Sequence, residues 1–137
     1  MTELLLAKIA DRSLASRDSF VDEINDRIEQ GSASASEVLD IVDRLAPLLA
    51  SESDPAVMES IFNLLGSAFD RIGVQESALQ VIIALLDGLS SGCLVHAIPI
   101  IGRSKSPERR ERIFPFLASP NIAVRAIAEE ALQSRSG

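Results

Sequence analysis

The sequence contains no tryptophan or tyrosine, a single cysteine and a single histidine. With so few aromatic residues, the core must be built from Leu, Ile, Val and Ala. That composition favours close packing of helices over a β-sandwich. The lone cysteine, Cys93, excludes an internal disulfide and is typical of a reducing compartment, so we expect a cytoplasmic protein.

Long hydrophobic runs are also missing. No stretch reaches the roughly 18 apolar residues that a membrane span requires. The run at residues 4–7 is too short for the core of a signal peptide and is followed at once by Lys8. The length of 137 residues fits one domain covering residues 1–137. We therefore expect one domain that does not bind a membrane.

The residues that catalysis and metal binding need are scarce. Any Cys/His or Ser/His/Asp site would have to include His96. Cys93 shares a predicted helical face with it, but the local sequence is apolar and offers no carboxylate to orient the ring. We expect a packing histidine beside an inert thiol. One His and one Cys cannot form a structural zinc site, and no glycine-rich phosphate loop is present. The sequence thus predicts no enzyme, cofactor or metal site.

The net charge of −7 is unevenly distributed. Residues 1–70 carry 14 acidic against five basic residues, whereas residues 71–137 carry six against eight. The acidity therefore belongs to the first half of the chain. A negative field repels nucleic acid and anionic lipid and attracts a basic partner. An acidic surface that serves only solubility is the alternative.

Apolar residues recur with a helical period along nearly the whole chain. No segment requires a strand, and the loops are short enough that consecutive helices should lie antiparallel. About four helical hairpins are expected. The predicted helices cover residues 2–15, 17–30, 37–50, 55–71, 74–88, 91–102, 107–118 and 120–134.

One pattern occurs twice. The segment Arg44–Ser51 returns as residues 112–119, each with a proline inside an apolar helical run that ends at Ala-Ser. A proline removes one helical hydrogen bond and bends the axis. Its recurrence in one setting predicts a unit used more than once, a bent helix followed by a second helix.

The last unit, residues 113–132, resembles a HEAT repeat. The resemblance is carried by Pro115 in the first helix, the Pro-Asn turn, Val124-Arg125 and an alanine-rich second helix ending in Ala-Leu. Residues 44–70 match less well, because Met58 replaces the arginine. The resemblance implies an all-α fold, a right-handed α-solenoid of about four antiparallel hairpins. It also implies that Arg125 ties its repeat to the turn of a neighbour.

The whole chain resembles a narrower group, the small acidic HEAT-like immunity proteins of bacteria, including those paired with contact-dependent growth-inhibition toxins. Residues 55–70 and 96–102 carry this resemblance. It implies an immunity protein that binds a basic toxin domain and occludes its active site. A HEAT-like adaptor or scaffold without that role is the alternative, and the sequence leaves the partner's identity and the oligomeric state open.

One arrangement looks like a binding site. Four acidic residues of the predicted helix 17–30 fall within about 80° of each other, roughly opposite its apolar face. Like charges at this spacing bring no folding benefit. These residues, here called the acidic stripe, are Asp18, Asp22, Asp26 and Glu29. If alternate helices share one side, Glu59 and Asp70 extend the surface toward a protein partner. A merely solvated face is the alternative.

A basic cluster surrounds the turn into the predicted helix 107–118. Its charges suit the end of the preceding helix, and Glu108 and Glu111 are the expected local partners. No Tyr or Trp accompanies it to stack on a base, and the body of the chain is acidic. We therefore expect no nucleic-acid binding. The cluster comprises Arg103, Lys105, Arg109, Arg110 and Arg112.

Overall fold

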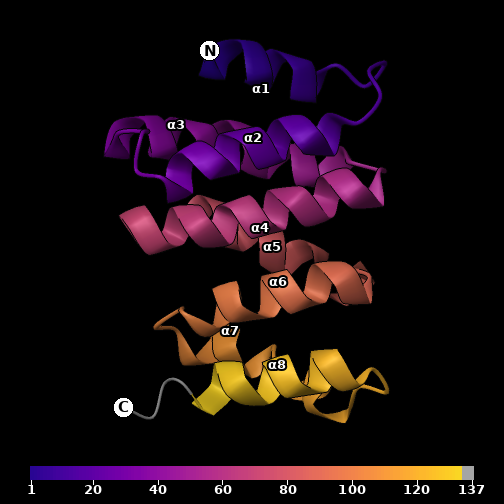
Figure 1. Ribbon diagram of the computed structural model, residues 1–137. Helices are drawn as coiled ribbons and strands as arrows, with labels where there is room; N and C mark the ends of the chain where they lie inside the picture. Colours follow the sequence, from indigo (N-terminus) through magenta and orange to yellow (C-terminus); the bar gives the residue numbers. More distant parts are fainter. Residues whose placement is uncertain (134–137) are drawn as a thin grey trace.

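The computed structural model describes residues 1–133, and within that range the chain is helical with no strand. The helices lie in two layers (Figure 1). One layer holds α2 (Arg17–Glu29), α4 (Pro55–Ile72), α6 (Ser91–Gly102) and α8 (Ile122–Gln133). Behind it lie α3 (Ala35–Leu45), α5 (Glu76–Leu85) and α7 (Pro107–Glu111), while α1 (Thr2–Ala10) covers the N-terminal end. The all-α prediction is confirmed.

The front layer is stacked in chain order. α2 packs on α4, α4 on α6 and α6 on α8, and α1 packs on α2. The back helices fill in behind, with α3 against α4 and α5 against α6. One face of the molecule is therefore formed by every second helix of the chain, namely α2, α4, α6 and α8.

Three predicted helices each divide into an α-helix and a 3₁₀ segment. These segments are η1 (Ala46–Ser51) after α3, η2 (Leu86–Gly88) after α5 and η3 (Phe114–Ala118) after α7. In η1 and η3 a proline occupies the first turn, where its missing N–H costs no hydrogen bond. The bent helix predicted from the repeated pattern is therefore an α-helix that ends and a tighter helix that begins.

Other boundaries differ less. α1 ends at Ala10 rather than at residue 15, because Asp11 turns back to accept hydrogen bonds from the Ser13 backbone and hydroxyl. α3 begins earlier than predicted, since Ser34 rather than Ser36 is its N-cap and forms a capping box with Glu37. The predicted last helix ends at residue 134, which lies outside the described residues.

The core is continuous from α1 to α8, and α4 is its central helix. α4 buries Phe62 and four aliphatic side chains completely, and each such side chain contributes about 1.5–3 kcal/mol to folding. α5 is apolar nearly all round in sequence but buries only Ala78, Leu79 and Ile82. Its remaining apolar residues are partly exposed because no helix of the front layer covers its outer side.

Two arginine side chains, Arg71 and Arg125, donate hydrogen bonds to backbone carbonyls in turns between helices. Arg71 at the end of α4 donates to the carbonyls of Ile28 and Ala33, 3.4 and 2.8 Å away, and so ties α4 to the turn between α2 and α3. Arg125 instead donates to the Ser119 carbonyl at 3.0 Å, within its own turn between η3 and α8. The expected tie from Arg125 to a neighbouring unit is therefore wrong, and it is Arg71 at the end of α4 that makes such a tie.

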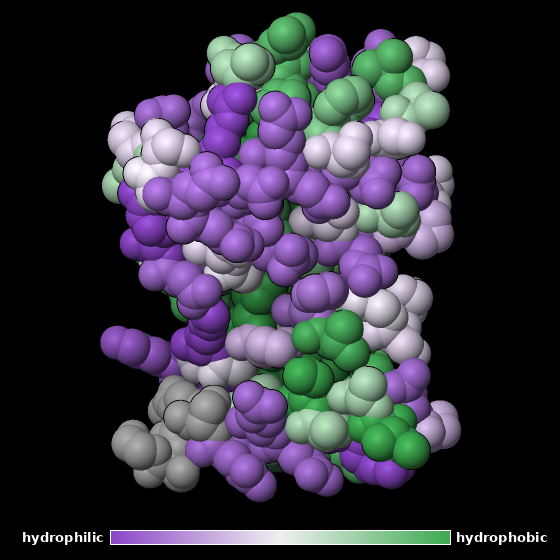
Figure 2. Space-filling model, in the orientation of Figure 1, coloured by the Kyte–Doolittle hydropathy of each residue, from purple (hydrophilic) through white to green (hydrophobic). Residues whose placement is uncertain are grey.

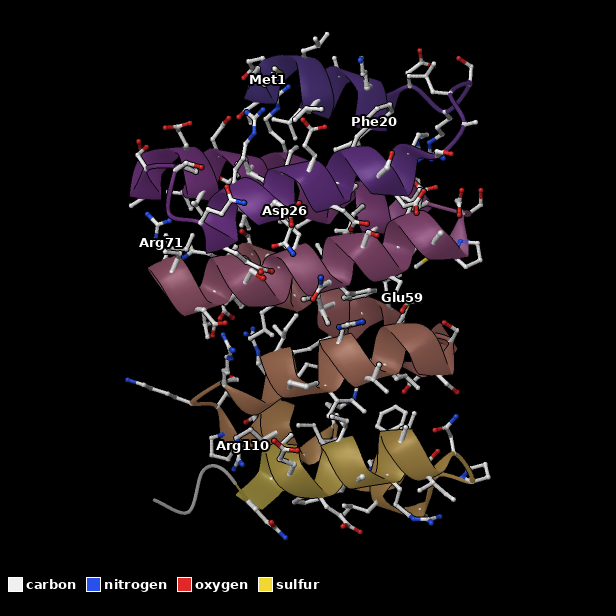
Figure 3. All side chains as sticks on the ribbon, in the orientation of Figure 1. Met1, Phe20, Asp26, Glu59, Arg71 and Arg110 are labelled. Atoms are coloured by element: carbon white, nitrogen blue, oxygen red, sulfur yellow. The ribbon has the colours of Figure 1, made fainter. Side chains whose placement is uncertain are left out.

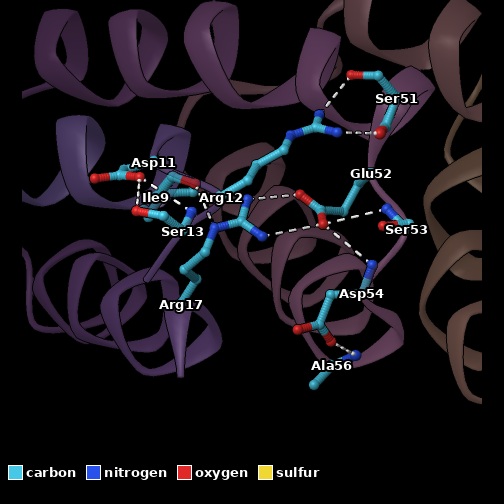
Figure 4. Close-up of polar contacts among 10 residues, drawn as sticks. All are labelled: Ile9, Asp11, Arg12, Ser13, Arg17, Ser51, Glu52, Ser53, Asp54 and Ala56. Atoms are coloured by element: carbon cyan, nitrogen blue, oxygen red, sulfur yellow. Dashed lines mark hydrogen bonds and ion pairs between the residues drawn. The ribbon is translucent and has the colours of Figure 1, made fainter. Parts of the chain in front are cut away.

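A buried polar cluster joins the first turn of α2 to the turn before α4 (Figure 4). Arg17 donates to the Ile9 carbonyl at 2.7 Å and to both carboxylate oxygens of Glu52. Glu52 also accepts from the backbone N–H groups of Ser53 and Asp54. Asp54 in turn caps α4 by accepting from Ala56 N–H at 2.9 Å. This cluster fixes the start of α2 against the start of α4.

Candidate functional site

The acidic residues of α2 and α4 lie on one face of the molecule. Figure 2 shows hydrophilic side chains covering α2 and α4 on the side toward the viewer. Asp18, Asp22 and Glu59 line a shallow hollow of about 260 Å³ there, together with Ala56, Ser60, Asn63 and His96. We call it the acidic hollow. The structure thus brings together three of the six residues predicted to bind a partner.

Helical periodicity and the buried cluster position these three carboxylates. Asp18 follows Arg17, whose side chain points inward to Glu52, so the next residue along α2 turns toward the surface. Asp22 lies one turn further on the same side. Glu59 stands on the second turn of α4, shortly after the cap that Asp54 forms.

Three aspartates of α2 make no pairing within the described residues. The side chains of Asp18, Asp22 and Asp26 form neither a hydrogen bond nor an ion pair in residues 1–133. Asp26 is exposed on α2, as Figure 3 shows, but it does not line the acidic hollow. The negative charge of this part of the acidic stripe is therefore uncompensated.

Glu29 and Asp70 have partners within the fold. Glu29 accepts hydrogen bonds from Asn25 at 2.9 Å and from the Ser67 hydroxyl at 3.3 Å, so it links α2 to α4. Asp70 forms an ion pair of 2.5 Å with Arg103 at the end of α6. Neither residue lines the acidic hollow, and the charge of Asp70 is balanced locally.

Glu59 lies against the beginning of α6. Its Oε1 is 3.7 Å from His96 Nε2. A Cβ placed on Gly92 would come within 2.9 Å of Glu59 Oε2, so the absence of a side chain at Gly92 allows this close approach. The first turn of a helix carries unpaired N–H groups and a partial positive charge, which favours a carboxylate there.

The surroundings of His96 differ from the prediction. We expected a core histidine without a carboxylate nearby, but the ring is half-buried and faces Glu59 on the preceding front helix. Cys93 matches the expected inert thiol, since it is 2 % exposed and burial raises its pKa. Among residues 1–133 no three His, Cys, Asp or Glu side chains are placed to hold a metal ion.

The basic cluster is paired with acidic residues of other helices. Arg103 pairs with Asp70, Arg109 with Glu76, and Arg112 with Asp87. Arg110 donates to the carbonyls of Ala131 and Leu132 on α8. The local partners Glu108 and Glu111 were therefore the wrong ones, because the stacking brings α4, α5 and η2 alongside this turn.

Comparison with protein-family models, curated protein sequences and solved structures finds no match to this chain. No helix in residues 1–133 is long and apolar enough to cross a membrane. The inferences about function therefore depend on the geometry of the chain itself.

Proposed function

We propose that this chain is a non-catalytic inhibitor, an immunity protein that acts in the cytoplasm. Its acidic face binds a basic toxin domain and occludes that domain's active site. The observation that carries the proposal is that Asp18, Asp22 and Asp26 have no hydrogen bond or ion pair with any other side chain of residues 1–133. Several other carboxylates of the acidic half do have cationic partners, among them Glu3 with Arg44 and Glu52 with Arg17.

The successive packing of α2, α4, α6 and α8 supports the interpretation of the fold as HEAT-like. We propose a right-handed α-solenoid of four hairpins, α1–α2, α3–α4, α5–α6 and α7–α8. In that arrangement α2, α4, α6 and α8 form one extended face, in agreement with the packing of each on the next. The acidic hollow is open and shallow, which suits the surface of a macromolecule better than a small ligand that needs enclosure.

Electrostatics give the proposed mechanism. An enzyme that acts on nucleic acid or another anionic substrate needs basic groups at its substrate site. Carboxylates without internal partners can cover those groups, and complementary charge speeds association and disfavours partners of the wrong sign. The inhibitor then needs no chemistry, because the bound surface itself excludes the substrate.

The test begins by isolating the partner. The full chain is purified from its native cell, the bound protein is identified by mass spectrometry, and association is measured by stopped flow. Reversal of Asp22 and Asp26 to lysine should slow association about tenfold or more at low salt. Reversal of Glu129 and Glu130 to lysine on α8 is the matched control. Unchanged association with the α2 variant would contradict the proposal.

An adaptor is the second candidate, and one observation favours it. Hydrophobic side chains near the C-terminal end remain exposed away from the acidic stripe, among them Phe114, Leu117 and Ile122. Such residues suit a second contact surface. An adaptor would hold two proteins at once and leave their activities intact, whereas an immunity protein would abolish the activity of one. An assay of the isolated partner with and without this chain separates the two.

A further inference from the structure

The acidic hollow spans α2, α4 and α6, and it forms one end of a longer groove that continues between α4 and α6. A second hollow of about 220 Å³ lies beside it, and the two share Asn63 and His96 as lining residues. The second hollow is lined by the apolar side chains of Phe62, Val95, Pro99 and Ile100 and also by polar side chains, among them Ser67, Asp70 and Arg103. We call the combined feature the α4–α6 groove.

The character of the groove changes along its length. One end carries Asp18, Asp22 and Glu59, and no Lys or Arg among residues 1–133 lines it. At the other end the charges of Asp70 and Arg103 neutralise each other at the rim. The groove therefore passes from a negative end to an end without net charge, where apolar side chains lie among polar ones.

Apolar surface continues beyond the groove. Figure 2 shows hydrophobic side chains gathered over α6 and α8, below the hydrophilic surface of α2 and α4. Residues of these two helices that remain partly exposed include Val95 and Ile127, and Ile122 is 73 % exposed. An apolar area beside a polar rim is the usual composition of a protein interface.

We infer that the α4–α6 groove binds a partner segment that carries a Lys or Arg side chain followed by apolar side chains. This inference rests on the proposed function and adds to it the chemistry of the bound segment. The cationic head lies among Asp18, Asp22 and Glu59, and the apolar side chains lie against Val95 and Pro99. Charge complementarity fixes the first contact, because carboxylates form strong charge-assisted hydrogen bonds with ammonium and guanidinium groups.

The two parts of the groove have different roles. A row of carboxylates alone binds any polycation and loses affinity steeply as salt increases. Apolar contact is insensitive to that screening and depends on which side chains follow the cation. The acidic end therefore speeds encounter, and the apolar side chains at the other end select among basic segments.

The test uses two synthetic peptides of equal charge. One has four lysines followed by two leucines, and the other has four lysines followed by two serines. Both are titrated into the full ¹⁵N-labelled chain and followed by NMR. The leucine peptide should bind about five- to tenfold more tightly, with shifts in the amide signals of Val95 and Ile100.

Protein variants then locate the effect. Val95→Asn should remove the preference for the leucine peptide, whereas Val74→Asn, at an exposed valine that does not line the groove, should retain it. Asp18→Asn with Asp22→Asn should weaken both peptides equally. Circular dichroism checks folding, and Val95→Thr, which keeps the side-chain shape, replaces Val95→Asn if that variant does not fold.

Equal affinities of the two peptides, or a preference that survives at Val95→Asn, would overturn this inference and leave the proposed function standing. Failure of both peptides to bind would overturn the cation site and with it the inference. A different result would contradict the proposed function. That result is an unchanged rate of association between the isolated partner and the variant in which Asp22 and Asp26 are replaced by lysine.

Discussion

The guanidinium of Arg17 lies 2.7 Å from Glu52 Oε1, with the two side chains only 5 % and 1 % exposed. This pair joins the first residue of α2 to the turn that precedes α4. Both helices that supply carboxylates to the acidic hollow are thus fixed, near their N-terminal ends, by one buried ion pair.

Removal of one partner should be costly. Arg17→Ala leaves Glu52 buried without its cation, and we expect the free energy of unfolding to fall by about 3–5 kcal/mol. Urea denaturation measures the loss. The control is Arg44→Ala, which breaks the exposed pair with Glu3 and should cost far less. If both variants lost the same free energy of unfolding, burial of the Arg17–Glu52 pair would not increase its contribution to stability.

The same pair predicts a dependence of stability on pH. The hydrogen bond from Arg17, chiefly, lowers the pKa of Glu52 below its ordinary value of 4.5 in the folded chain. The folded state therefore favours the ionised carboxylate. That stabilisation is complete above pH 4.5 and is lost as the pH falls through the lowered pKa.

Urea unfolding of the wild type and of Glu52→Gln between about pH 3 and pH 7 tests this linkage. The wild type should be the more stable protein at neutral pH, and the difference should shrink in acid. A difference that stays constant across this range would contradict the assigned pKa direction.

Substitution by alanine should have opposite effects on stability at two glycines, Gly102 and Gly66. A Cβ on Gly102 would meet Ala131 Cβ at 3.0 Å and its backbone oxygen at 3.2 Å, so Gly102→Ala must push α6 and α8 apart. Gly66 lies inside α4 with nothing within 4 Å of such a Cβ. Gly66→Ala should stabilise the chain by about 0.5–1 kcal/mol, and Gly102→Ala should destabilise it. Thermal unfolding of the two variants side by side gives the comparison.

Cys93 should react slowly in the native protein. Its thiol is buried, and burial raises its pKa, so little thiolate is present or accessible at neutral pH. Labelling with an aromatic disulfide reagent should proceed at the rate at which the chain opens and should become fast in denaturant. Rapid labelling of the folded chain would mean that α6 opens readily around residue 93.

Local signals gave most of the helix boundaries correctly. The prediction that a helix begins at residue 55 is confirmed, and the structure shows the reason, because Asp54 is the N-cap of α4 and Pro55 its first residue. The stripe on α2 followed from helical periodicity alone. The 3₁₀ segments were not predicted in detail, because a proline inside an apolar run signals a disturbance without specifying whether the helix bends or ends.

The pairing of charges could not be predicted from sequence. Three pairs form only because the helices stack. They are Glu59 with His96, Asp70 with Arg103 and Arg17 with Glu52. No spacing along the chain encodes these distances. The sequence therefore identified which acidic residues share a helix face but could not tell which of them the fold itself uses.

The unpaired aspartates of α2 have a consequence for how this chain can change over generations. Asp22 and Asp26 repel each other along one side of the helix, so their replacement by neutral residues should not harm folding. Asp18 differs, because a carboxylate in the first turn of α2 interacts favourably with the positive end of the helix dipole. Arg17 and the buried face of α2 carry the structural requirement instead. Under the proposed function, partner recognition and folding therefore depend on different residues of one helix, and the surface residues can change for a new partner while the buried residues stay the same.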